Sequence, residues 1–287
     1  MASRISGTTR LVGLFGSPVA HSRSPVMQNT VFEAMGLDLV YLAFDAGADR
    51  AGDVARTIRL LNLRGANVTM PLKRALLPYL DALSPAARRC GAVNVVVNDD
   101  GVLTGHISDG EGFLLSLDEA GVGVAGQCMV ILGAGGAGIA VAVQASIAGA
   151  KATLFNRRDG FFAQAGTLLD HPENAAISLL DMDDTDALAQ AVAEADILVN
   201  ATPLGMKGAS EAVALPDLSL LRPGLTVCDL VYVPRETRLL REAARRGCRT
   251  VSGLGMQLWQ AVPAFSLWTG REMDVDLARR VLFEGAA

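Results

Sequence analysis

Three glycines at a fixed spacing mark where a phosphate-bearing ligand could bind this chain. Gly133, Gly135 and Gly138 follow the pattern G-x-G-x-x-G, between an apolar run at 128–132 and an alanine-rich run at 139–148. In this pattern the first glycine permits a tight turn, the second lets the backbone approach a pyrophosphate, and the third lets a helix pack on a strand. A turn that serves only packing is the alternative. Because a predicted strand precedes the glycines and a predicted helix follows them, the stretch indicates a dinucleotide site at the helix N-terminus.

The residues that follow the next predicted strand bear on which dinucleotide would bind. In the NAD version of this fold, an acidic residue about 20 positions past the glycines bonds the ribose hydroxyls. Here that strand runs into Asn156, Arg157, Arg158 and Asp159. The two arginines could clamp a 2′-phosphate, whereas Asp159 could accept from a free ribose diol and repel that phosphate. The sequence carries both signals, and we expect NAD, with NADP also accepted.

Two hydroxyl side chains lie at an earlier strand-to-helix junction. Ser22 and Ser24 are two positions apart, and Pro25 predicts the first turn of a helix with Ser24 as its N-cap. Capping alone would explain Ser24. Beside His21 and Arg23, the two serines could also bind a small polar ligand.

Lys73 and Asp109 each stand at the start of a predicted helix. A lysine in the first turn opposes the helix dipole, so Lys73 gains nothing locally from its position. Such a conflict between a local rule and a placement is expected at functional sites, although a solvated surface lysine is the simpler interpretation. Asp109 is equally explained as a helix cap.

The elements that must position these residues form two α/β domains. After the glycines, predicted strands alternate with helices, which is typical of a parallel sheet covered on both faces. The predicted strands are 11–15, 39–44, 65–71, 91–98, 102–105, 128–132, 152–156, 195–200, 226–230 and 249–251. The predicted helices are 26–35, 49–61, 76–90 (broken near Ser84), 108–120, 139–148, 160–170, 184–194, 236–246, 256–268 and 274–284. We expect a substrate-binding and catalytic domain from 1–108 with 255–287, a Rossmann-type domain at 109–254, and a cleft between them.

Composition limits the partners of this chain. Of 287 residues, 51% are hydrophobic and 19% charged, and the formal net charge is −5, so neither nucleic acid nor an anionic membrane is expected as a partner. The four cysteines are far apart, which predicts neither a disulfide framework nor a metal site. The N-terminus lacks the apolar core of a secretory signal, and the most apolar stretch, 137–150, is too short and polar to span a bilayer. We expect a cytoplasmic protein with reduced thiols.

Ten motifs occur along the chain in a particular order. They are HSRSP (21–25), NVTMPLK (67–73), GAVN (91–94), SDGEGF (108–113), GAGGAG (133–138), NRRD (156–159), NATPLGM (200–206), DLVYVP (229–234), GMQLWQAVPAF (255–265) and LWTG (267–270). Together they resemble the shikimate dehydrogenases over the whole chain. The run 156–162, NRRD followed by Gly and two phenylalanines, is most similar to their quinate/shikimate dehydrogenase branch, which uses NAD as well as NADP.

The resemblance implies an activity and a role for each matching residue. The activity would be the reversible, NAD(P)-dependent oxidation of a secondary alcohol of shikimate or quinate, a small polyhydroxy carboxylic acid, by a monomer or homodimer. Lys73 and Asp109 would form the catalytic pair. The residues that contact substrate would be Ser22 and Ser24 at the carboxylate, Thr69, Asn94 and Gln260 at ring hydroxyls, and Tyr41 and Tyr232. The residues that bind cofactor would be Gly133, Ala134, Gly135, Gly136, Ala137, Asn156, Arg157, Arg158, Asp159, Thr202, Val231, Gly255 and Met256.

Departures from the family pattern keep other functions open. Ile107 and Ser108 stand where the family has Asn-Thr before the catalytic aspartate, His106 stands where tyrosine is common, and Pro203 replaces a common serine. An apolar Ile107 beside Asp109 would suit a different hydroxy acid, or a cofactor-binding regulatory protein with weak catalysis. A dehydrogenase with a histidine base is a third hypothesis, for which only His106 is placed near the site.

Overall fold

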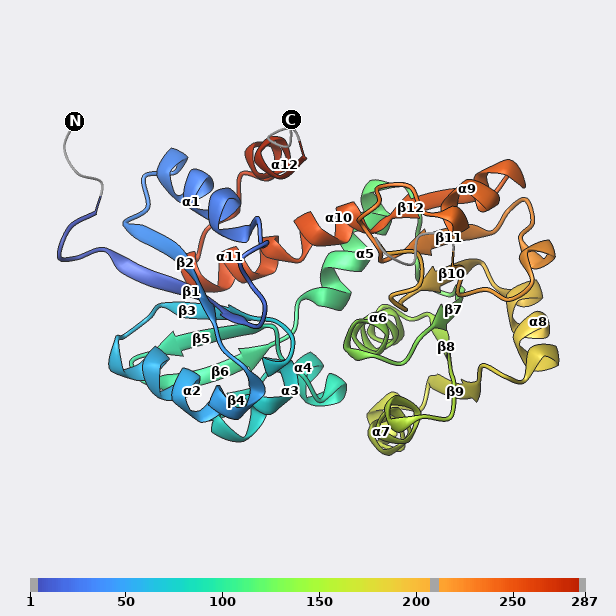
Figure 1. Cartoon of the computed structure of the whole chain (residues 1–287), viewed down its shortest axis with the longest axis horizontal. Helices are drawn as coiled ribbons and strands as arrows, with labels where there is room; N and C mark the ends of the chain where they lie inside the picture. The colour runs from blue at the N-terminus through green and yellow to red at the C-terminus, as the bar shows by residue number, and fades with distance from the viewer. Residues whose placement is uncertain (1–4, 207–211, 284–287) are drawn as a thin grey trace. The chain divides into compact units, whose positions relative to one another are not determined.

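The computed structural model describes residues 5–206 and 212–283. It divides into two compact units, one formed by Met1–Ser108 with Ala261–Ala287 and the other by Asp109–Gln260 (Figure 1). The sequence predicts residues 255–260 as part of the first domain. They belong to the second unit because their helix α10 (Gly253–Trp259) packs along α5 (Asp109–Glu119). The predicted cleft between domains stays a prediction.

The first unit is built on a mixed six-stranded sheet in the order β2-β1-β3-β5-β6-β4. Its strands are β1 (Arg10–Gly16), β2 (Leu39–Asp45), β3 (Gly65–Val68), β4 (Ala82–Leu83), β5 (Val95–Asp99) and β6 (Val102–His106). β1 runs parallel to β2 and β3, whereas β5 runs antiparallel to β3 and β6. The β5–β6 hairpin turns at Asp100 and Gly101, which both have positive φ, the conformation that tight two-residue hairpin turns require.

The helices of the first unit come from both ends of the chain. They are α1 (Ser24–Ala34), α2 (Ala51–Leu60), α3 (Leu72–Ala75), α4 (Pro85–Cys90), α11 (Ala261–Thr269) and α12 (Val275–Phe283). Aromatic contacts hold α11 in the core of the first unit. The Phe32 and Phe265 rings lie 5.6 Å apart, and the Tyr41 and Trp268 rings 6.1 Å apart.

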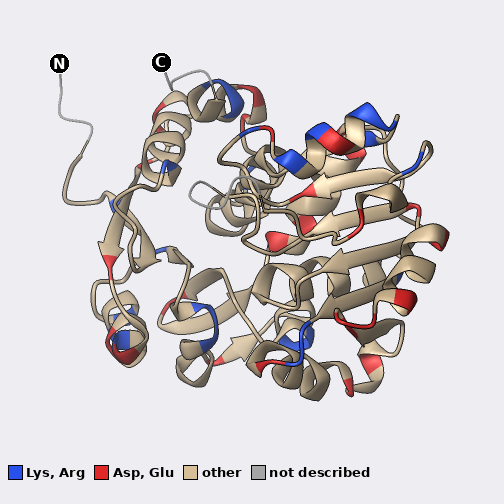
Figure 2. Cartoon of the chain, turned by 45° about the vertical axis from the view of Figure 1, so that its right-hand side comes forward, with Lys and Arg blue, Asp and Glu red and all other residues tan. Residues whose placement is uncertain are grey.

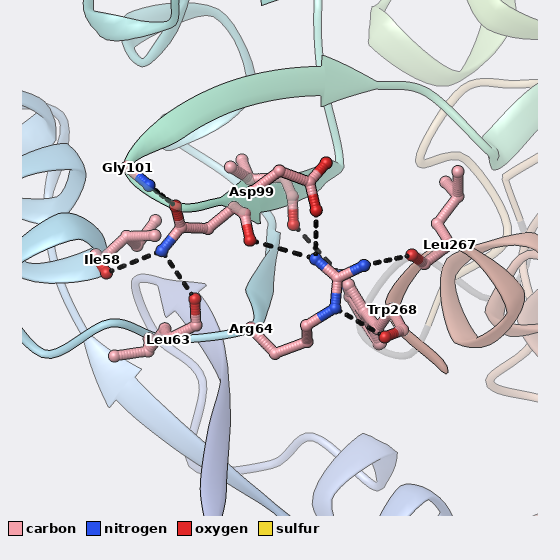
Figure 3. Close-up of polar contacts among 9 residues, drawn as sticks. Ile58, Leu63, Arg64, Asp99, Gly101, Leu267 and Trp268 are labelled. Carbon is pink, nitrogen blue, oxygen red and sulfur yellow. Dashed lines mark hydrogen bonds and ion pairs between the residues drawn. The ribbon is translucent and has the colours of Figure 1, made fainter. Parts of the chain in front are cut away.

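Arg64 fastens the end of α11 to the sheet (Figure 3). Its guanidinium donates to the carbonyls of Trp268 at 2.7 Å and Leu267 at 3.0 Å. It also donates to the Asn98 carbonyl and to the Asp99 carboxylate at the start of the hairpin, each at 3.0 Å. The last carbonyls of a helix have no partner within the helix, so one side chain here satisfies two of them and joins segments 200 residues apart.

The second unit holds a parallel six-stranded sheet in the order β12-β11-β10-β7-β8-β9. Its strands are β7 (Cys128–Leu132), β8 (Lys151–Asn156), β9 (Ile177–Asp181), β10 (Ile197–Asn200), β11 (Thr226–Asp229) and β12 (Arg249–Ser252). Its helices besides α5 and α10 are α6 (Gly136–Ile147), α7 (Gly160–Leu169), α8 (Thr185–Glu194) and α9 (Arg238–Arg245). Read from the β9 edge and numbered with β7 as strand 1, this order is 3-2-1-4-5-6, which is the order of dinucleotide-binding domains. The predicted α/β fold class is confirmed.

Three local predictions were wrong. Ser24 is the first residue of α1 rather than its side-chain N-cap, and the backbone N–H of Ser24 donates instead to Ser22 Oγ at 3.2 Å. The predicted helix 256–268 is two helices that meet at Gln260, because Pro263 has no N–H to donate to the Trp259 carbonyl. In the predicted helix 76–90, the break near Ser84 is confirmed, because Ser84 caps α4 by accepting from the Ala87 N–H, but residues 76–83 are not α-helical.

Charge and hydropathy of the described residues bear on the partners that the chain could have. In the view of Figure 2, basic and acidic residues are interspersed along the ribbon. Within residues 5–206 and 212–283, no helix has the length and apolar character needed to cross a membrane.

Candidate functional site

The glycine-rich turn lies at the carboxyl end of β7, where the strand order of the second unit reverses. Gly133 has φ +106°, a conformation that favours glycine, and a Cβ there would meet Thr202 Cγ2 at 2.9 Å. A Cβ at Gly138 would clash with the Gly133 carbonyl, so the third residue of α6 must be a glycine. Gly135 and Gly136 differ, because apart from their chain neighbours and the adjoining backbone of α6 no atom lies within 4 Å of a Cβ built on either. The turn is therefore tight on its inner side and open where a pyrophosphate would approach α6, so it fits the dinucleotide that the sequence predicts.

Asn156, at the end of β8, ties this turn to the next loop. Its Oδ1 accepts from the Ala134 N–H at 3.0 Å, and its Nδ2 donates to the Arg157 carbonyl and to Asp159 Oδ1 at 2.8 and 2.9 Å. Ala137, on the first turn of α6, is half-buried. The amide of Asn156 is thus used by the protein to hold the loop 157–159 beside the glycine turn.

The charged side chains of that loop each have a protein partner. Asp159 Oδ1 caps α7 by accepting from the Phe161 and Phe162 N–H groups. Arg158 Nε donates to Asp181 Oδ2 at 2.6 Å, and its guanidinium lies 5.3 Å from the centre of the Phe162 ring.

A buried polar network holds the two loops that follow β10 and β11. Asp229 Oδ1 accepts from Asn200 Nδ2 at 2.9 Å and from the Val231 N–H at 3.0 Å, and its Oδ2 accepts from Thr237 Oγ1 at 2.7 Å. Asn200 Oδ1 in turn accepts from the N–H and hydroxyl of Thr202. Burial raises the pKa of the Asp229 carboxyl, and the hydrogen bonds from Thr237, Val231 and Asn200 oppose that rise.

The remaining cofactor candidates of this unit and the substrate candidate Tyr232 lie on the loop after β11 and on α10. Val231 is buried, whereas Tyr232 is 39% exposed. Gly255 and Met256 are half-buried on α10, and a Cβ at Gly255 would meet Ser116 Cβ of α5 at 2.8 Å. Close packing of α10 on α5 thus fixes the positions of Gly255 and Met256.

Asp109 and Gln260 are also held by α5 and its neighbours. Asp109 is the first residue of α5 and is 3% exposed. A Cβ at Gly110 would clash with the Ala140 carbonyl of α6, and one at Gly112 would clash with the backbone of Gln260. Glycines on α5 therefore permit close helix contacts that position the predicted catalytic carboxylate and the predicted substrate amide within one unit.

In the first unit, Ser24, Tyr41 and Asn67 lie together. Tyr41 is fully buried, and its hydroxyl donates to Asn67 Oδ1 at 2.8 Å, while Asn67 Nδ2 donates to the Asn94 carbonyl at 3.0 Å. Burial raises the pKa of the Tyr41 hydroxyl, and its hydrogen bond with Ser24 opposes that effect. Ser22 is half-buried two residues before Ser24. A chain of hydroxyl and amide groups therefore links α1, β2 and β3.

Thr69, Lys73 and Ser108 follow strands of the same sheet, and Asn94 directly precedes β5. Thr69 comes directly after β3, where its N–H donates to the Phe15 carbonyl at 2.9 Å. The Lys73 carbonyl accepts from the Val93 N–H at 2.9 Å, and the Lys73 side chain is half-buried on α3. Asn94 Oδ1 accepts from the Ser108 N–H at 2.8 Å, and Asn94 Nδ2 bonds Ser108 Oγ at 3.1 Å.

The two unusual residues before Asp109 have contrasting environments. Ile107 is 7% exposed. His106 is half-buried at the end of β6, and burial lowers the pKa of its imidazole, against the weaker effect of Asp99. His106 is therefore held neutral more readily than a free histidine.

The structure groups the predicted residues by unit. The first unit holds Ser22, Ser24, Tyr41, Thr69, Lys73 and Asn94, and the second holds Asp109, Tyr232, Gln260 and every predicted cofactor residue. Sequence reasoning missed Asn67, Asn200, Asp229, Thr237 and Asp181. Of these, Asn200 ends the predicted strand 195–200 and begins the quoted motif 200–206, a position where a polar residue often bears on a site. Within the described ranges, no cluster of three or more His, Cys, Asp or Glu residues is placed to hold a metal ion.

Comparisons with known proteins agree with this architecture. Residues 14–96 match the model of the shikimate dehydrogenase substrate binding domain, and residues 253–283 match that of the shikimate 5′-dehydrogenase C-terminal domain. The chain is 48% identical to a shikimate dehydrogenase (NADP(+)) of Listeria innocua, over 99% of both chains. It is 41% identical to a quinate/shikimate dehydrogenase of Escherichia coli, over 98% of this chain and 99% of the relative. The crystal structure of shikimate 5-dehydrogenase from Listeria monocytogenes in complex with shikimate and NAD is 47% identical, with a TM-score of 0.93 over 99% of both chains.

The second unit is Rossmann-type with an open glycine turn, and the first unit carries buried hydroxyl and amide groups. Together with the dehydrogenase relatives, these features place the chain among the oxidoreductases that bind dinucleotides. With relatives of this identity along its full length, the chain belongs to the shikimate dehydrogenase family, as the sequence motifs predicted.

Proposed function

We propose that this enzyme catalyses the reversible, NAD(P)-dependent oxidation of a secondary alcohol of shikimate, quinate or both. The observation that carries the proposal is the likeness over the full chain to a shikimate dehydrogenase and to a quinate/shikimate dehydrogenase, combined with an open glycine turn at the switch point of the second unit. A bound nicotinamide supplies the hydride acceptor for alcohol oxidation. The residues of the chain must then bind the substrate, orient it and take its hydroxyl proton.

Lys73 and Asp109 are the proposed catalytic pair. A lysine amine accepts the hydroxyl proton when its surroundings bring its pKa toward the working pH. Asp109, held at the N-terminus of α5 by close helix packing, would orient the ammonium. A carboxylate favours the charged amine, so exclusion of water must act in the opposite direction.

Hydroxyl and amide side chains support recognition of a polyhydroxy carboxylic acid. Ser22 and Ser24 would bond its carboxylate, and Thr69, Asn94 and Gln260 its ring hydroxyls. Tyr41 is fully buried with its hydroxyl bonded to Asn67, so it would act by orienting Ser24 and Asn67. Such polar groups reject analogues that lack a hydroxyl, because their own hydrogen bonds would be left unmade. Tyr232 would contribute from the second unit.

The cofactor is proposed to be NAD, with NADP also used. The glycine turn would hold the pyrophosphate, the loop 156–159 the adenosine ribose, and Thr202, Val231, Gly255 and Met256 the nicotinamide end. Relatives named for NADP(+) and a relative in complex with NAD support use of both. A monomer or homodimer and a cytoplasmic location stay predictions.

Initial-rate oxidation of shikimate and quinate, each with NAD and with NADP, tests this proposal. Lys73→Ala should lower kcat by about 10²-fold or more, the size of a lost general base. Lys151→Ala is the matched control, because Lys151 is an exposed lysine at the start of β8, the end of the strand opposite to the glycine turn. It should turn over like the wild type.

Other results would favour another function. Equal rates for wild type and Lys73→Ala with all four pairs would contradict the proposed chemistry. Tight NADH binding without any turnover would favour the regulatory hypothesis that Ile107 motivates. A His106→Ala variant with wild-type rates would exclude a histidine base.

A further inference from the structure

Asp181 lies beside the loop expected to bind the adenosine ribose, on a strand that sequence reasoning missed. β9 pairs with β8 in a register that puts Asp181 opposite Asn156, at the carboxyl edge of the sheet. The Met182 N–H donates to the Asn156 carbonyl at 3.0 Å, which fixes the two strand ends together. Asp181 therefore stands next to the residue that joins the glycine turn to the loop 157–159.

The Asp181 carboxylate holds Arg158 in one orientation. Its Oδ2 accepts from Arg158 Nε at 2.6 Å, and its Oδ1 accepts from the Asp183 N–H at 3.1 Å. The Arg158 guanidinium is also placed over the Phe162 ring. Asp181 is only 20% exposed in its side chain, whereas Arg158 is 73% exposed, so the carboxylate is the fixed member of the pair.

The charges around this loop oppose a dianion. Two arginines and three aspartates gather here, Arg157, Arg158, Asp159, Asp181 and Asp183, and their formal charges sum to −1. Arg157 and Asp183 approach to 3.9 Å with both side chains largely exposed. A 2′-phosphate on the ribose would bring about −1.5 to −2 further charge, whereas the 2′-hydroxyl of NAD brings none. Asp159 uses Oδ1 for its three hydrogen bonds, which leaves Oδ2 as the oxygen able to accept from a ribose hydroxyl.

We propose that Asp181 is a specificity-determining residue, which favours NAD over NADP by neutralising and orienting Arg158 beside the ribose site. This inference rests on the proposed function, because it requires NAD(P) to bind at the glycine turn. Asp181 contacts neither the reacting atoms nor the glycine turn, and it acts through Arg158.

Binding of two small probes tests the inference without turnover. Adenosine 2′,5′-bisphosphate carries the 2′-phosphate of NADP, and 5′-AMP carries the free diol of NAD. Isothermal titration of both probes into the full chain should show that Asp181→Asn raises affinity for the bisphosphate by roughly fivefold, the size expected of one partly screened surface charge. Affinity for 5′-AMP should change less than about twofold. The gain should shrink at high salt, which a structural role would not require.

Asp170→Asn is the matched control, because it removes the same charge from an exposed residue at the end of α7 without an arginine contact in the described chain. It should leave both affinities unchanged. Adding Arg158→Gln to Asp181→Asn should abolish the gain, because the gain requires the released guanidinium. The ratio of kcat/KM for NADP to that for NAD should rise in parallel with the bisphosphate affinity.

Three results with Asp181→Asn would overturn the inference. An unchanged ratio of the two probe affinities in Asp181→Asn would show that the carboxylate does not affect selection. Equal losses for both probes would show a structural role, and a selective loss of bisphosphate affinity would show that Asp181 aims Arg158 at the phosphate. Wild-type protein that binds the probes but oxidises no substrate would refute the proposed function and leave the inference intact. Failure to bind either probe would refute both.

Discussion

Asp229 shows how a single buried side chain can position two loops that would contact a cofactor. Its carboxylate is 1% exposed and accepts from Asn200, Val231 and Thr237. Asp229 positions Thr202 through Asn200, whose Oδ1 accepts from the N–H and hydroxyl of Thr202. Asp229 bonds the Val231 N–H directly. Neither Thr202 nor Val231 could keep its place if the carboxylate were removed and its donors left unpaired.

Asp229→Ala should therefore lower the free energy of unfolding by about 3 kcal/mol or more, since each of three buried donors loses its acceptor at about 1 kcal/mol or above. Asp229→Asn should cost about 1 kcal/mol, because an amide keeps one oxygen for Asn200 and Val231 and can donate to the Thr237 hydroxyl. Urea denaturation of the three proteins measures both. Equal losses in the two variants would contradict this assignment of the hydrogen bonds.

The difference in the free energy of unfolding between wild type and Asp229→Asn should also depend on pH. The folded-state pKa of Asp229 lies above its ordinary value of 3.8, so folding takes up a proton there. The stabilising contribution of this group is complete below the unfolded-state pKa and is lost as pH rises through the folded-state pKa. The wild type should thus gain stability relative to Asp229→Asn as pH falls from 7 toward 4.

At the scale of the elements, the glycine turn contains two glycines that its own folding requires and one that only ligand binding would require. Gly133 and Gly138 are required by the turn itself, because a side chain would strain or clash there. Gly136 begins α6 and has open space around a Cβ, so the protein alone would accept alanine. An alanine methyl would instead stand where a pyrophosphate would approach the helix N-terminus.

Gly136→Ala should keep or slightly raise the melting temperature, since it removes backbone freedom from the unfolded chain. It should weaken NAD binding by about tenfold or more, an amount that corresponds to roughly 1.4 kcal/mol of lost contact with the pyrophosphate. Gly166→Ala, inside α7, is the control that should change stability without changing affinity. Wild-type affinity in Gly136→Ala would place the cofactor elsewhere.

Elements with strong local signals were predictable from the sequence, and those set by neighbours were not. β7 and α6 follow from an apolar run, three glycines and an alanine-rich helix. β9 was missed because ISLLD (177–181) is a five-residue edge strand that gains its order from pairing with β8. The break at Gln260 does have a signal, Pro263 in the first turn of α11, that the apolar pattern concealed.

For the candidate site, the sequence could supply residue types but not their pairings. Ser22, Ser24, Lys73 and the glycines were found from local motifs. The bonds that orient them join distant residues, such as Tyr41 to Asn67 and Asn200 to Asp229, which are 26 and 29 positions apart. Only tertiary structure brings such groups within hydrogen-bond distance, so their roles could not be read from spacing.

At the scale of the whole molecule, the chain leaves its first unit at Ser108 and returns to it at Ala261. The returning segment must therefore be held by contacts rather than by continuity. The Trp268 indole donates to the Val96 carbonyl at 3.0 Å, and Arg64 binds the carbonyls that end α11. The Arg64 side chain is 17% exposed, so its carbonyl partners have little access to water as a replacement.

Arg64→Ala should lower the free energy of unfolding of the first unit by about 3 kcal/mol or more, because three carbonyls lose a charged donor at above 1 kcal/mol each. Arg64→Lys should lie between this variant and wild type, since an ammonium lacks the planar fork that reaches α11 and the hairpin together. Trp268 lies in the first unit and Trp259 in the second, so Trp268 fluorescence in a Trp259→Phe background during urea denaturation reports on the first unit.

Arg56→Ala is the control, because Arg56 is 75% exposed and pairs only with Asp53 in the described structure, so its loss should cost less than about 0.5 kcal/mol. NAD affinity measured without urea should remain that of wild type in Arg64→Ala, because the nucleotide residues lie in the second unit. A variant that loses affinity and stability together would show that the two units do not respond separately to this contact.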